Sequence, residues 1–512
     1  MRKRILSVLL IISMIAAVSA CDHRGMDLAM DTGWDVDFTE EPTTITYLTI
    51  GDKPTNGKTE NVIKELNKIL VKKVNARLDI YYVGWDDYLN QYNSALRTAE
   101  NIDLIGTSTD WLDAWPNVVD GNFLPMSKEM IRTFCPRTYS NVMEEQWNKC
   151  TYNGNIYFIP ENEYTQWTNH GFIYRLDIAR QAGIDCINNW NDLNDYMVYL
   201  TSNRQDMLAW DADGTNVIPT LGYLTSVSEY VPIYEISTYG LWGIYGKQSK
   251  TIESPYYSGE DYINYARLMK KWDEMGVWRA GLDGSGDNSD EFYSGYTALD
   301  EHHTQKYYTE IEPTMEVRQP GAEIDFYWFG KDCGNLQRTS ILHGAMAISA
   351  RSRNPEKALM VYDELRNDPE CYRLICYGIE GVQYVRTKDG RIEKPSGYNE
   401  TRDSIVTNFW WGRRDELELS DKAYAWDEYY ELIDDYDHVA IDYLWDGYNL
   451  QFEMGNEELS AVLAICDEYI PRIAYGQYSC TPEEEVEEFR ARLKEAGFEN
   501  ITNQIQKIVD SY

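Results

Sequence analysis

The order of strand-like and helix-like segments constrains the fold of this chain more than any other feature. Residues 44–51, TITYLTIG, are rich in β-branched and aromatic residues and end at a glycine, which is typical of a strand. Apolar residues then recur at helical spacing, namely Val62, Ile63, Leu66, Ile69 and Leu70. Residues 76–84, ARLDIYYVG, return to a strand pattern. A strand, a helix and a second strand in this order predict a βαβ unit, so we expect a parallel sheet in an α/β fold.

The same alternation continues along the chain. Residues 102–108, 170–175 and 344–350 are further predicted strands, and a capped amphipathic helix is expected after Thr481. Between about 202 and 325 no regular pattern stands out. A chain of 512 residues is too long for one hydrophobic core, so we expect two lobes or more.

The first 21 residues have the layout of a secretory signal peptide. Three basic residues precede an uncharged run from Ile5 to Val18, and small residues then lead to Cys21. Fourteen helical residues cover about 21 Å, which is short of the roughly 30 Å of a bilayer core, so no permanent transmembrane helix is expected. Residues 18–21, VSAC, resemble the bacterial lipobox, in which the cysteine is lipidated, for example with palmitate, and becomes the mature N-terminus. An ordinary signal peptide is the alternative.

On the lipobox interpretation, residues 1–20 are removed and Cys21 holds the protein on the extracytoplasmic face of the bacterial cell membrane through its acyl chains. Residues 22–44 are polar, acidic and aperiodic, which is typical of a tether. A flexible segment of 23 residues reaches about 25 Å. We therefore expect a folded body that begins near residue 45.

Acidic residues outnumber basic residues, 84 against 47, for a net charge of −37. Removal of residues 1–20 deletes three basic residues and no acidic one, which leaves a net charge of −40. Such a surface repels phosphate backbones, so nucleic acid is not an expected partner.

Eight cysteines follow Cys21. An even number in an exported chain permits disulfides, and Cys135 with Cys150 is the closest plausible pair. The spacings are irregular, however, and a chain of this size is stable without covalent links. Free and mostly buried cysteines are the favoured interpretation.

Aromatic residues are the second compositional anomaly, with 41 Tyr and 16 Trp against 12 Phe. Tyr and Trp combine a flat apolar face with a polar edge, and a sugar ring needs both because its C–H faces stack while its hydroxyls hydrogen-bond. Most of these residues must serve packing, so the excess is a weak indication of a carbohydrate ligand.

No sequence motif of catalysis or of a cofactor is found. The chain lacks GxSxG, HExxH and a P-loop, and nothing marks a pair of carboxylates for glycoside hydrolysis. His302 and His303 are adjacent, and adjacent side chains point apart, so a metal site there is not expected. Residues 211–216 and 283–288 faintly resemble calcium loops, but surface turns are favoured. We expect no enzymatic activity, no cofactor and no metal.

Eight segments, taken in order, resemble the extracellular solute-binding proteins of family 1, the lipoprotein receptors of bacterial ABC sugar importers. They include ITYLTIGDKP, IDLIGTSTDW, NGNIYFIPENE, GFIYRLDIARQAGID, SRNPEKAL, GIEGVQY and the C-terminal tail from EYIPRIAYGQYSC onward. GIEGVQY together with this tail resembles a lipoprotein subgroup of the family. One departure is Thr98-Ala99-Glu100-Asn101, where family members often carry a glycine-rich loop.

The resemblance implies a two-lobed α/β fold of the periplasmic-binding-protein type (type II), with the ligand in a cleft between lobes that hinge strands join. Mapped onto this chain, lobe 1 would comprise 45–162 and 326–398, and lobe 2 would comprise 163–325 and 399–512. The implied function is capture of a carbohydrate, in our interpretation an oligosaccharide, and its delivery to the subunits of an ABC permease.

Candidate ligand contacts follow from position, because ligands of open parallel sheets bind beyond the carboxyl ends of the strands. Asp52 follows the first predicted strand and Trp85 the second. Ser108, Asp110 and Trp111 follow IDLIG, where a stacking ring stands beside a hydroxyl and a carboxylate. For each of these positions a plain turn or a packing role is the alternative.

Further candidates lie on predicted connections. Glu161, Glu163 and Trp167 stand on the crossover between the lobes, where a hinge role suits them equally. Two more pairs complete the set: Trp242 and Trp328 are flanked by glycines, and Glu380 and Tyr384 belong to the GIEGVQY motif.

Two other functions remain open at this point. A secreted glycan-active enzyme would need a pair of carboxylates and a turnover product. A receptor for peptides or another non-sugar solute would have the same fold and a different ligand.

Overall fold

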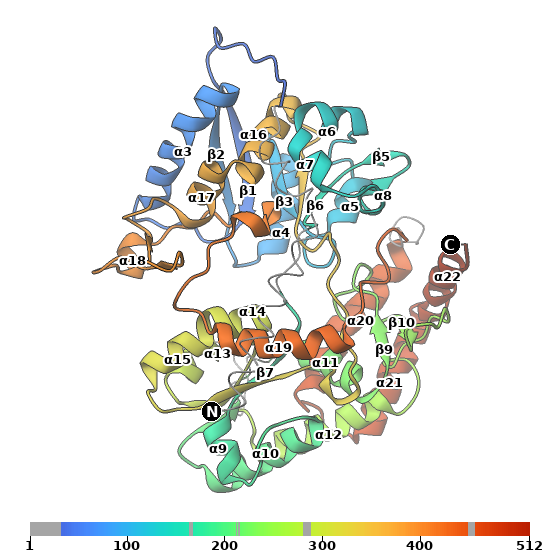
Figure 1. The fold of residues 1–512 in the computed structure, drawn as a ribbon. Helices are drawn as coiled ribbons and strands as arrows, with labels where there is room; N and C mark the ends of the chain where they lie inside the picture. The colour runs from blue at the N-terminus through green and yellow to red at the C-terminus, as the bar shows by residue number, and fades with distance from the viewer. Residues whose placement is uncertain are drawn as a thin grey trace. The chain divides into compact units, whose positions relative to one another are not determined.

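The computed structural model describes residues 32–162, 167–210, 212, 214, 216–279, 288–448 and 456–511, and these form two compact units (Figure 1). Unit 1 comprises the described residues of Met1–Ser108, Leu112–Tyr164 and Gly344–Leu419. Unit 2 comprises those of Thr109–Trp111, Thr165–His343 and Ser420–Tyr512. Cys21 and Glu163 lie outside the described residues.

The boundaries of the units differ from the predicted lobes at three places, the first being residues 109–111, which fall in unit 2 rather than lobe 1. Residues 326–343 fall in unit 2 rather than lobe 1, because strand β12 (Ile324–Trp328) pairs with β7 (His170–Arg175) of that unit. Residues 399–419 fall in unit 1 rather than lobe 2, because Asn408 is hydrogen-bonded to the strand that opens unit 1.

A five-stranded sheet forms the centre of unit 1, in the order β2-β1-β3-β13-β6. Its strands are β1 (Thr43–Ile50), β2 (Ala76–Val83), β3 (Leu104–Thr107), β13 (Ala345–Ile348) and β6 (Ile159–Pro160). β1 is parallel to β2 and to β3, as the βαβ pattern predicts, whereas β13 is antiparallel to β3 and β6. The carboxyl ends of β1, β2 and β3 therefore lie at one edge of the sheet.

The crossover from β1 to β2 is helix α3 (Lys58–Val74), which packs on β2 (Figure 1). Its apolar stripe is the predicted one, since Val62, Leu66 and Leu70 are fully buried. The other elements of unit 1 are α4 (Tyr88–Thr98), α5 (Ala114–Val119), α6 (Lys128–Phe134), α7 (Pro136–Asn141), α8 (Glu144–Lys149), β4 (Thr151–Tyr152), β5 (Asn155–Ile156), α16 (Pro355–Asn367), α17 (Pro369–Tyr377), β14 (Val385–Arg386), β15 (Ile392–Glu393), α18 (Glu400–Asp403), η4 (Trp410–Gly412) and η5 (Asp415–Leu417).

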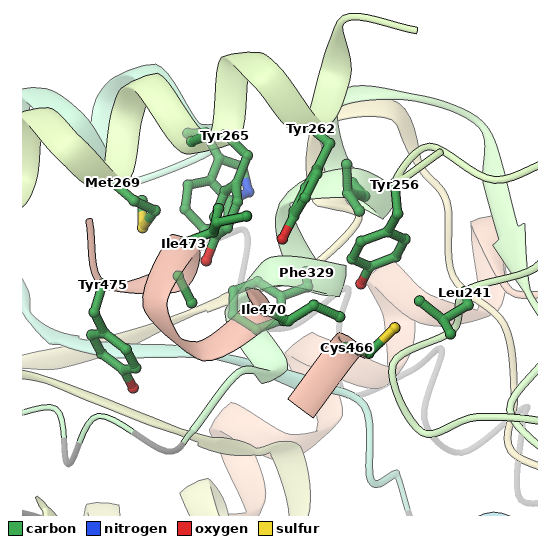
Figure 2. Packing of buried hydrophobic residues seen from close by; sticks show 14 of the residues in the cluster. Leu241, Tyr256, Tyr262, Tyr265, Met269, Phe329, Cys466, Ile470, Ile473 and Tyr475 are labelled. Carbon is green, nitrogen blue, oxygen red and sulfur yellow. The ribbon is translucent and has the colours of Figure 1, made fainter. Parts of the chain in front are cut away.

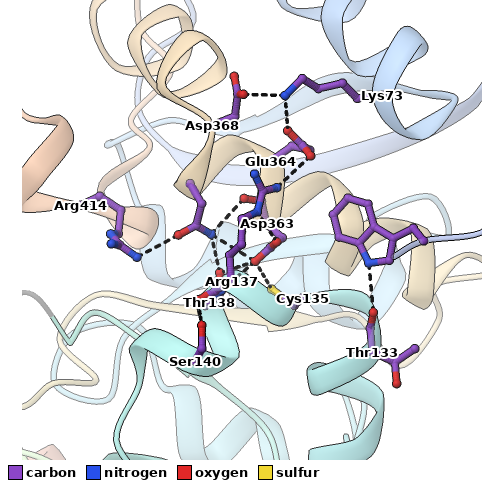
Figure 3. A network of polar contacts seen from close by, with 12 residues as sticks. Lys73, Thr133, Cys135, Arg137, Thr138, Ser140, Asp363, Glu364, Asp368 and Arg414 are labelled. Carbon is purple, nitrogen blue, oxygen red and sulfur yellow. Dashed lines mark hydrogen bonds and ion pairs between the residues drawn. The ribbon is translucent and has the colours of Figure 1, made fainter. Parts of the chain in front are cut away.

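A buried polar network joins α16 to α7 in unit 1 (Figure 3). The Asp363 carboxylate accepts hydrogen bonds from Arg137 Nε at 2.9 Å and from the Thr138 amide at 2.9 Å. Asn367 Nδ2 donates to the same carboxylate at 3.1 Å, and Arg414 Nη1 donates to Asn367 Oδ1 at 2.9 Å. Since a buried charge is tolerated only when it is paired, this network fixes the two helices in register.

A four-stranded sheet, in the order β12-β7-β11-β8, lies in unit 2. β7 is antiparallel to β12 and to β11 (Thr297–His303), and β11 is parallel to β8 (Leu208–Trp210). A separate two-stranded sheet pairs β9 (Tyr230–Pro232) with β10 (Gly243–Tyr245).

Helices surround these sheets and account for the rest of unit 2. They are α9 (Leu176–Gln181), α10 (Trp190–Asn203), α11 (Ile218–Val227), α12 (Asp261–Met275), α13 (Asn288–Tyr293), α14 (Thr304–Lys306), η2 (Tyr307–Ile311), α15 (Glu312–Arg318), η3 (Lys331–Cys333), α19 (Trp426–Val439), α20 (Asn456–Ala474), α21 (Pro482–Glu495) and α22 (Phe498–Ser511). Thr481 and Glu484 form the predicted capping box of α21, with the Glu484 amide donating to Thr481 Oγ1 at 3.2 Å.

Much of the tyrosine and tryptophan excess lies in the core of unit 2. Figure 2 shows Tyr256, Tyr262 and Tyr265 packed with Cys466 and Ile470 of α20, and all five are buried. The aromatic composition is therefore in large part a packing feature, which agrees with the excess being only a weak indication of a carbohydrate ligand.

The eight cysteines after Cys21 are all free thiols, as expected, but only half of them are buried, fewer than predicted. Four are buried, two are half-buried, and Cys186 and Cys333 are exposed. Among the described residues no helix is both long enough and apolar enough to cross a membrane.

Candidate functional site

Two of the predicted ligand contacts meet at the carboxyl ends of β1 and β2 in unit 1. Asp52 Oδ1 accepts a hydrogen bond from the backbone amide of Trp85 at 3.2 Å, which brings the two residues together. Gly51 precedes them with φ 149°, and a Cβ atom there would lie 2.3 Å from Asn408 Nδ2. Only glycine therefore allows residues 408–411 to pack over this strand end.

Asn408 holds a second aromatic residue, Trp410, at the same place. Its side-chain amide donates to the Ile50 carbonyl at 2.7 Å, and its own carbonyl accepts from the hydroxyls of Tyr47 and Thr49. These bonds hold Trp410 next to Trp85, with ring centroids 6.1 Å apart.

The two indoles are unusually accessible for residues of their size. Trp85 is 45% exposed and Trp410 is 40% exposed, and Tyr88 packs edge-on against Trp85 at 5.9 Å. We call Asp52, Trp85, Tyr88 and Trp410 the unit 1 aromatic face. Large exposed apolar rings beside a carboxylate are a common feature of binding surfaces.

Two other predicted contacts, Asp110 and Trp111, belong to unit 2. The Thr109 amide donates to the Leu342 carbonyl at 3.1 Å, which joins residues 109–111 to the segment that ends at His343. Asp110 Oδ2 lies 2.8 Å from His343 Nδ1, and Trp111 Nε1 donates to the His343 carbonyl at 3.3 Å. The three side chains are half-buried.

A second polar group of unit 2 is built on Tyr443. Its hydroxyl accepts from the Tyr234 amide at 3.2 Å and donates to Glu235 Oε2, and the rings of Tyr234 and Tyr443 stack at 6.3 Å. Nearby, Ser340 Oγ donates to Asp446 Oδ1.

A backbone hydrogen bond joins these two groups, since the His343 amide donates to the Ser340 carbonyl at 3.0 Å. The pKa of Glu235 is raised to about 8, mainly by burial and also by the carboxylates of Asp446 and Asp110, while the hydrogen bond from the Tyr443 hydroxyl acts in the opposite direction. Asp110 also raises the pKa of Tyr234, to which burial contributes most. At neutral pH Glu235 is therefore largely an uncharged acid, able both to donate and to accept a hydrogen bond.

We call this set the unit 2 cluster. It consists of Asp110, Trp111, Tyr234, Glu235, Ser340, His343, Tyr443 and Asp446. It combines aromatic faces, hydroxyls and carboxyl groups from four segments that are distant in sequence. Two of these segments, 109–111 and 340–343, lie where the chain passes between the units, and a third, 230–235, runs from β9 into the loop before β10. Such an arrangement can bind a polyhydroxylated ligand, since each ring can stack and each carboxyl oxygen can accept a hydroxyl proton.

The remaining predicted contacts of unit 1 have internal partners. Ser108 is fully buried, and Glu161 is 4% exposed at the end of β6, where its amide donates to Gly344. Glu380 is exposed and forms an ion pair with Arg386 at 3.4 Å, while Tyr384 is buried. We do not include these four residues in the site.

Three predicted tryptophans of unit 2 are core residues. Trp242 stacks on Phe498 at 4.8 Å, and Trp167 and Trp328 both pack against Tyr436. All three are less than 7% exposed, so the glycines beside Trp242 and Trp328 permit close packing within the protein rather than approach of a ligand. Glu163 cannot be placed, since it lies outside the described residues.

The histidine pair differs from its prediction in geometry. The rings of His302 and His303 lie 4.3 Å apart because His303 ends β11 and its Nδ1 accepts the Lys306 amide of α14, so the side chains do not point apart. The pKa of both imidazoles is lowered, with burial as the largest cause, so both are neutral.

Within the described residues, one group has donor atoms close enough for a metal ion: Glu364, Asp368 and Cys371. Lys73 Nζ lies 3.0 Å from the Glu364 carboxylate and 2.5 Å from that of Asp368, so an ammonium already neutralises these acids. The two calcium-like segments fall largely outside the described residues.

A protein-family model and a relative match this chain. A protein-family model described as "Domain of unknown function (DUF3502)" matches residues 446–512. A Streptococcus pneumoniae protein described as a carbohydrate ABC transporter substrate-binding protein is 21% identical to this chain over 509 residues, which are 98% of this chain and 96% of the relative.

Solved structures agree over most of the chain. The N-glycan transport solute-binding protein NgtS of Streptococcus pneumoniae superposes with a TM-score of 0.72 at 17% identity, covering 92% of this chain and 98% of that one. The same protein in complex with Man1GlcNAc gives 0.68 at 18% identity, covering 92% and 99%. The alginate-binding protein AlgQ2 gives 0.66 at 14% identity, covering 92% and 99%.

These matches extend over both units, and the predicted resemblance is confirmed. This chain has the two-unit α/β fold of the extracellular solute-binding proteins.

Proposed function

We propose that this protein is the substrate-binding protein of an ABC importer, and that its ligand is an oligosaccharide. The observation that carries the proposal is the unit 2 cluster, in which Trp111 and Tyr234 offer stacking faces beside the carboxyl groups of Asp110, Glu235 and Asp446. The relative from Streptococcus pneumoniae and NgtS, both named for carbohydrate or glycan transport, support the same ligand class.

The chemistry of the cluster suits a sugar ring. A pyranose presents C–H groups on its faces, which pack on indole and phenol rings, and hydroxyls at its edge, which donate to carboxylate oxygens. In unit 1, Trp85 and Trp410 offer a second stacking surface with Asp52 beside it. The glycans named for the NgtS structures favour an oligosaccharide over a monosaccharide.

Delivery to a permease and attachment to the membrane are parts of this proposal. The signal-like residues 1–20 and Cys21 support a lipid anchor on the extracytoplasmic face of the cell membrane. A ligand that binds one arrangement of the two units more tightly than another shifts the population toward that arrangement, which gives a permease a difference to recognise. Mass spectrometry of the protein from its native membrane tests the anchor, since a Cys21→Ser variant must lose the mass of the acyl groups.

The binding experiment uses residues 22–512 in a thermal-shift screen against plant and host oligosaccharides, with short peptides alongside. A ligand that binds the native state raises the melting temperature. We expect a shift with one family of glycans and recovery of the sugar intact. Shifts with peptides alone would overturn the carbohydrate ligand, and a cleaved sugar would show an enzyme.

A matched pair of variants tests the site. Trp111→Ala removes a ring of the unit 2 cluster, whereas Tyr296→Ala removes an exposed ring next to the opposite end of β11 from His303. We expect the first to abolish the glycan-dependent shift and the second to leave it unchanged, with similar melting temperatures for both in the absence of sugar.

A further inference from the structure

We infer that the unit 2 cluster selects glycans without negative charge and rejects uronic-acid glycans of the same size and linkage. This inference rests on the proposed function and adds the charge class of its ligand. The fold alone does not decide the matter, because an alginate-binding protein and an N-glycan transport protein share it, and alginate is a polyuronate.

Three carboxyl groups make the unit 2 cluster acidic. Asp110 contacts His343, the His343 amide donates to the Ser340 carbonyl at 3.0 Å, and Ser340 Oγ donates to Asp446. Glu235 accepts from Tyr443, three residues before Asp446. All three residues with these carboxyl groups are half-buried, so they are neither sealed in the core nor freely exposed to water. A ligand carboxylate placed among them would stand beside two negative charges in a partly dehydrated site, where like-charge repulsion is weakly screened.

The basic side chains near the cluster already have acidic partners. His343 Nδ1 lies 2.8 Å from Asp110 Oδ2. Arg338, on the same segment as His343, lies over the Trp167 ring at 5.1 Å and within 3.7 Å of the carboxylates of Asp437 and Asp442. Among the described members of the cluster there is no lysine or arginine to form the bidentate pair that a uronate prefers.

The unit 1 aromatic face is also acidic. Asp52 is hydrogen-bonded to Trp85, and two further acids, Asp86 and Asp87, follow Trp85 directly. Lys53, the neighbouring cation, is paired with Glu60 at 3.2 Å. Neither unit therefore offers an uncommitted cation at the residues we assign to the ligand.

Uncharged sugars can form hydrogen bonds with these carboxyl groups without charge repulsion. A sugar hydroxyl donates to the carboxylates of Asp110 and Asp446, and the protonated Glu235 donates in turn to a ring or hydroxyl oxygen. An acetamido group supplies one donor and one acceptor without charge. Discrimination thus comes from repulsion of the wrong ligand as well as from attraction of the right one.

Matched ligands provide the test. Oligomers of mannuronate, guluronate and galacturonate are each compared with their carboxyl-reduced forms, which keep size and linkage, and with neutral mannose- and N-acetylglucosamine-containing oligosaccharides. Binding to residues 22–512 is measured by calorimetry at low and high salt. We expect measurable affinity for a neutral glycan and at least tenfold weaker binding of every oligouronate, with a smaller gap at high salt. A uronate that binds as tightly as its reduced form overturns this inference and leaves the proposed function intact. If no glycan of either kind binds, the proposed function fails with it.

A charge variant separates the cluster from the net charge of the protein. In Asp110→Asn/Asp446→Asn two carboxylates become neutral amides of the same shape, and the gap between reduced and acidic ligands should narrow by about tenfold. Asp510→Asn removes one exposed carboxylate on α22 and should leave the gap unchanged. An unaltered gap in the double variant, in protein with wild-type circular dichroism and melting temperature, would contradict the assignment to this cluster.

Discussion

At the scale of single residues, Glu235 shows how a carboxyl group can serve as an uncharged hydrogen-bonding group. It accepts from Tyr443 while Asp110 and Asp446 stand near, and burial together with these two charges keeps its proton in place. No feature of the sequence around Glu235 signals this role, because its three partners lie on other segments. Asp110 and Trp111, in contrast, follow a buried strand, so the sequence singles them out as candidates, and their contact with a ligand stays a prediction.

The titration of Glu235 gives a prediction for stability. The carboxyl has a pKa of about 8 in the folded chain against an ordinary value of 4.5, so between these pH values the folded chain binds the extra proton. The stabilisation that Glu235 gives the folded state is therefore complete below about pH 4.5 and is lost as the pH rises through 8. Gln cannot ionise and still accepts from Tyr443. We expect Glu235→Gln to raise the melting temperature relative to the wild type by an amount that grows from pH 5 to pH 8.

The control for this experiment is Glu495→Gln, at the exposed end of α21. Its difference from the wild type should not grow over the same pH range. A Glu235→Gln effect that is equal at pH 5 and pH 8 would mean that the side chain is ionised in the folded protein.

Trp85 gives the second prediction at this scale. Its ring is 45% exposed, so Trp85→Ala should change the melting temperature little, while affinity for the oligosaccharide falls at least tenfold, or about 1.4 kcal/mol. Tyr81→Ala, on the same strand β2 and 37% exposed, is the matched control. Calorimetry with the glycan found in the screen measures both. Equal affinities for the two variants would remove Trp85 from the site.

At the scale of elements, the predicted strands and helices hold where a segment carries its own signal. β1, β2 and β7 begin and end within one residue of their predicted bounds, since each is a run of β-branched and aromatic residues bounded by turn residues. The stretch from 202 to 325 could not be assigned, because β8, β9 and β10 have three residues each, too few for a period. The 15-residue helix α12 was also missed, because its buried face consists largely of Tyr, Trp and Met.

The contact between α16 and α7 gives a prediction about an element. Arg137 and Asp363 form an ion pair that is almost fully buried, so Arg137→Ala leaves a carboxylate without its partner. We expect a loss of about 3–5 kcal/mol in the free energy of unfolding. Arg132→Ala, which breaks an exposed pair with Glu129 on the neighbouring helix α6, should cost less than about 1 kcal/mol. Urea denaturation of both variants measures the difference, and similar losses would show that the network of Figure 3 is not what holds α16 to α7.

At the scale of the whole molecule, charge is the dominant property. The mature chain predicted here carries a net charge of −40, and charges of one sign repel one another in the folded state more than in the expanded unfolded state. The units themselves could be predicted in number and approximate extent. Their boundaries could not, because pairing of β12 with β7 and anchoring of Asn408 on β1 are contacts between segments far apart in sequence.

Salt should therefore stabilise this protein. As sodium chloride rises from about 20 to 300 mM the Debye length shortens to less than 10 Å, which screens the repulsion more than it weakens the close surface ion pairs. We expect the melting temperature of residues 22–512 to rise over this range, and sucrose of equal osmolarity serves as the control for non-ionic effects. A melting temperature that falls with salt would mean that attractive pairs outweigh the net charge.

The interleaving of the two units has a consequence for biosynthesis. The unit 2 cluster draws on residues 109–111, 230–235, 340–343 and 443–446, so a growing chain holds its first members long before its last. A ribosome that stops early releases a polypeptide with Asp110 and Trp111 but without Tyr443 and Asp446. On the proposed function, competence for the glycan is acquired only when translation is nearly finished, so ligand binding would report that the polypeptide has been completed.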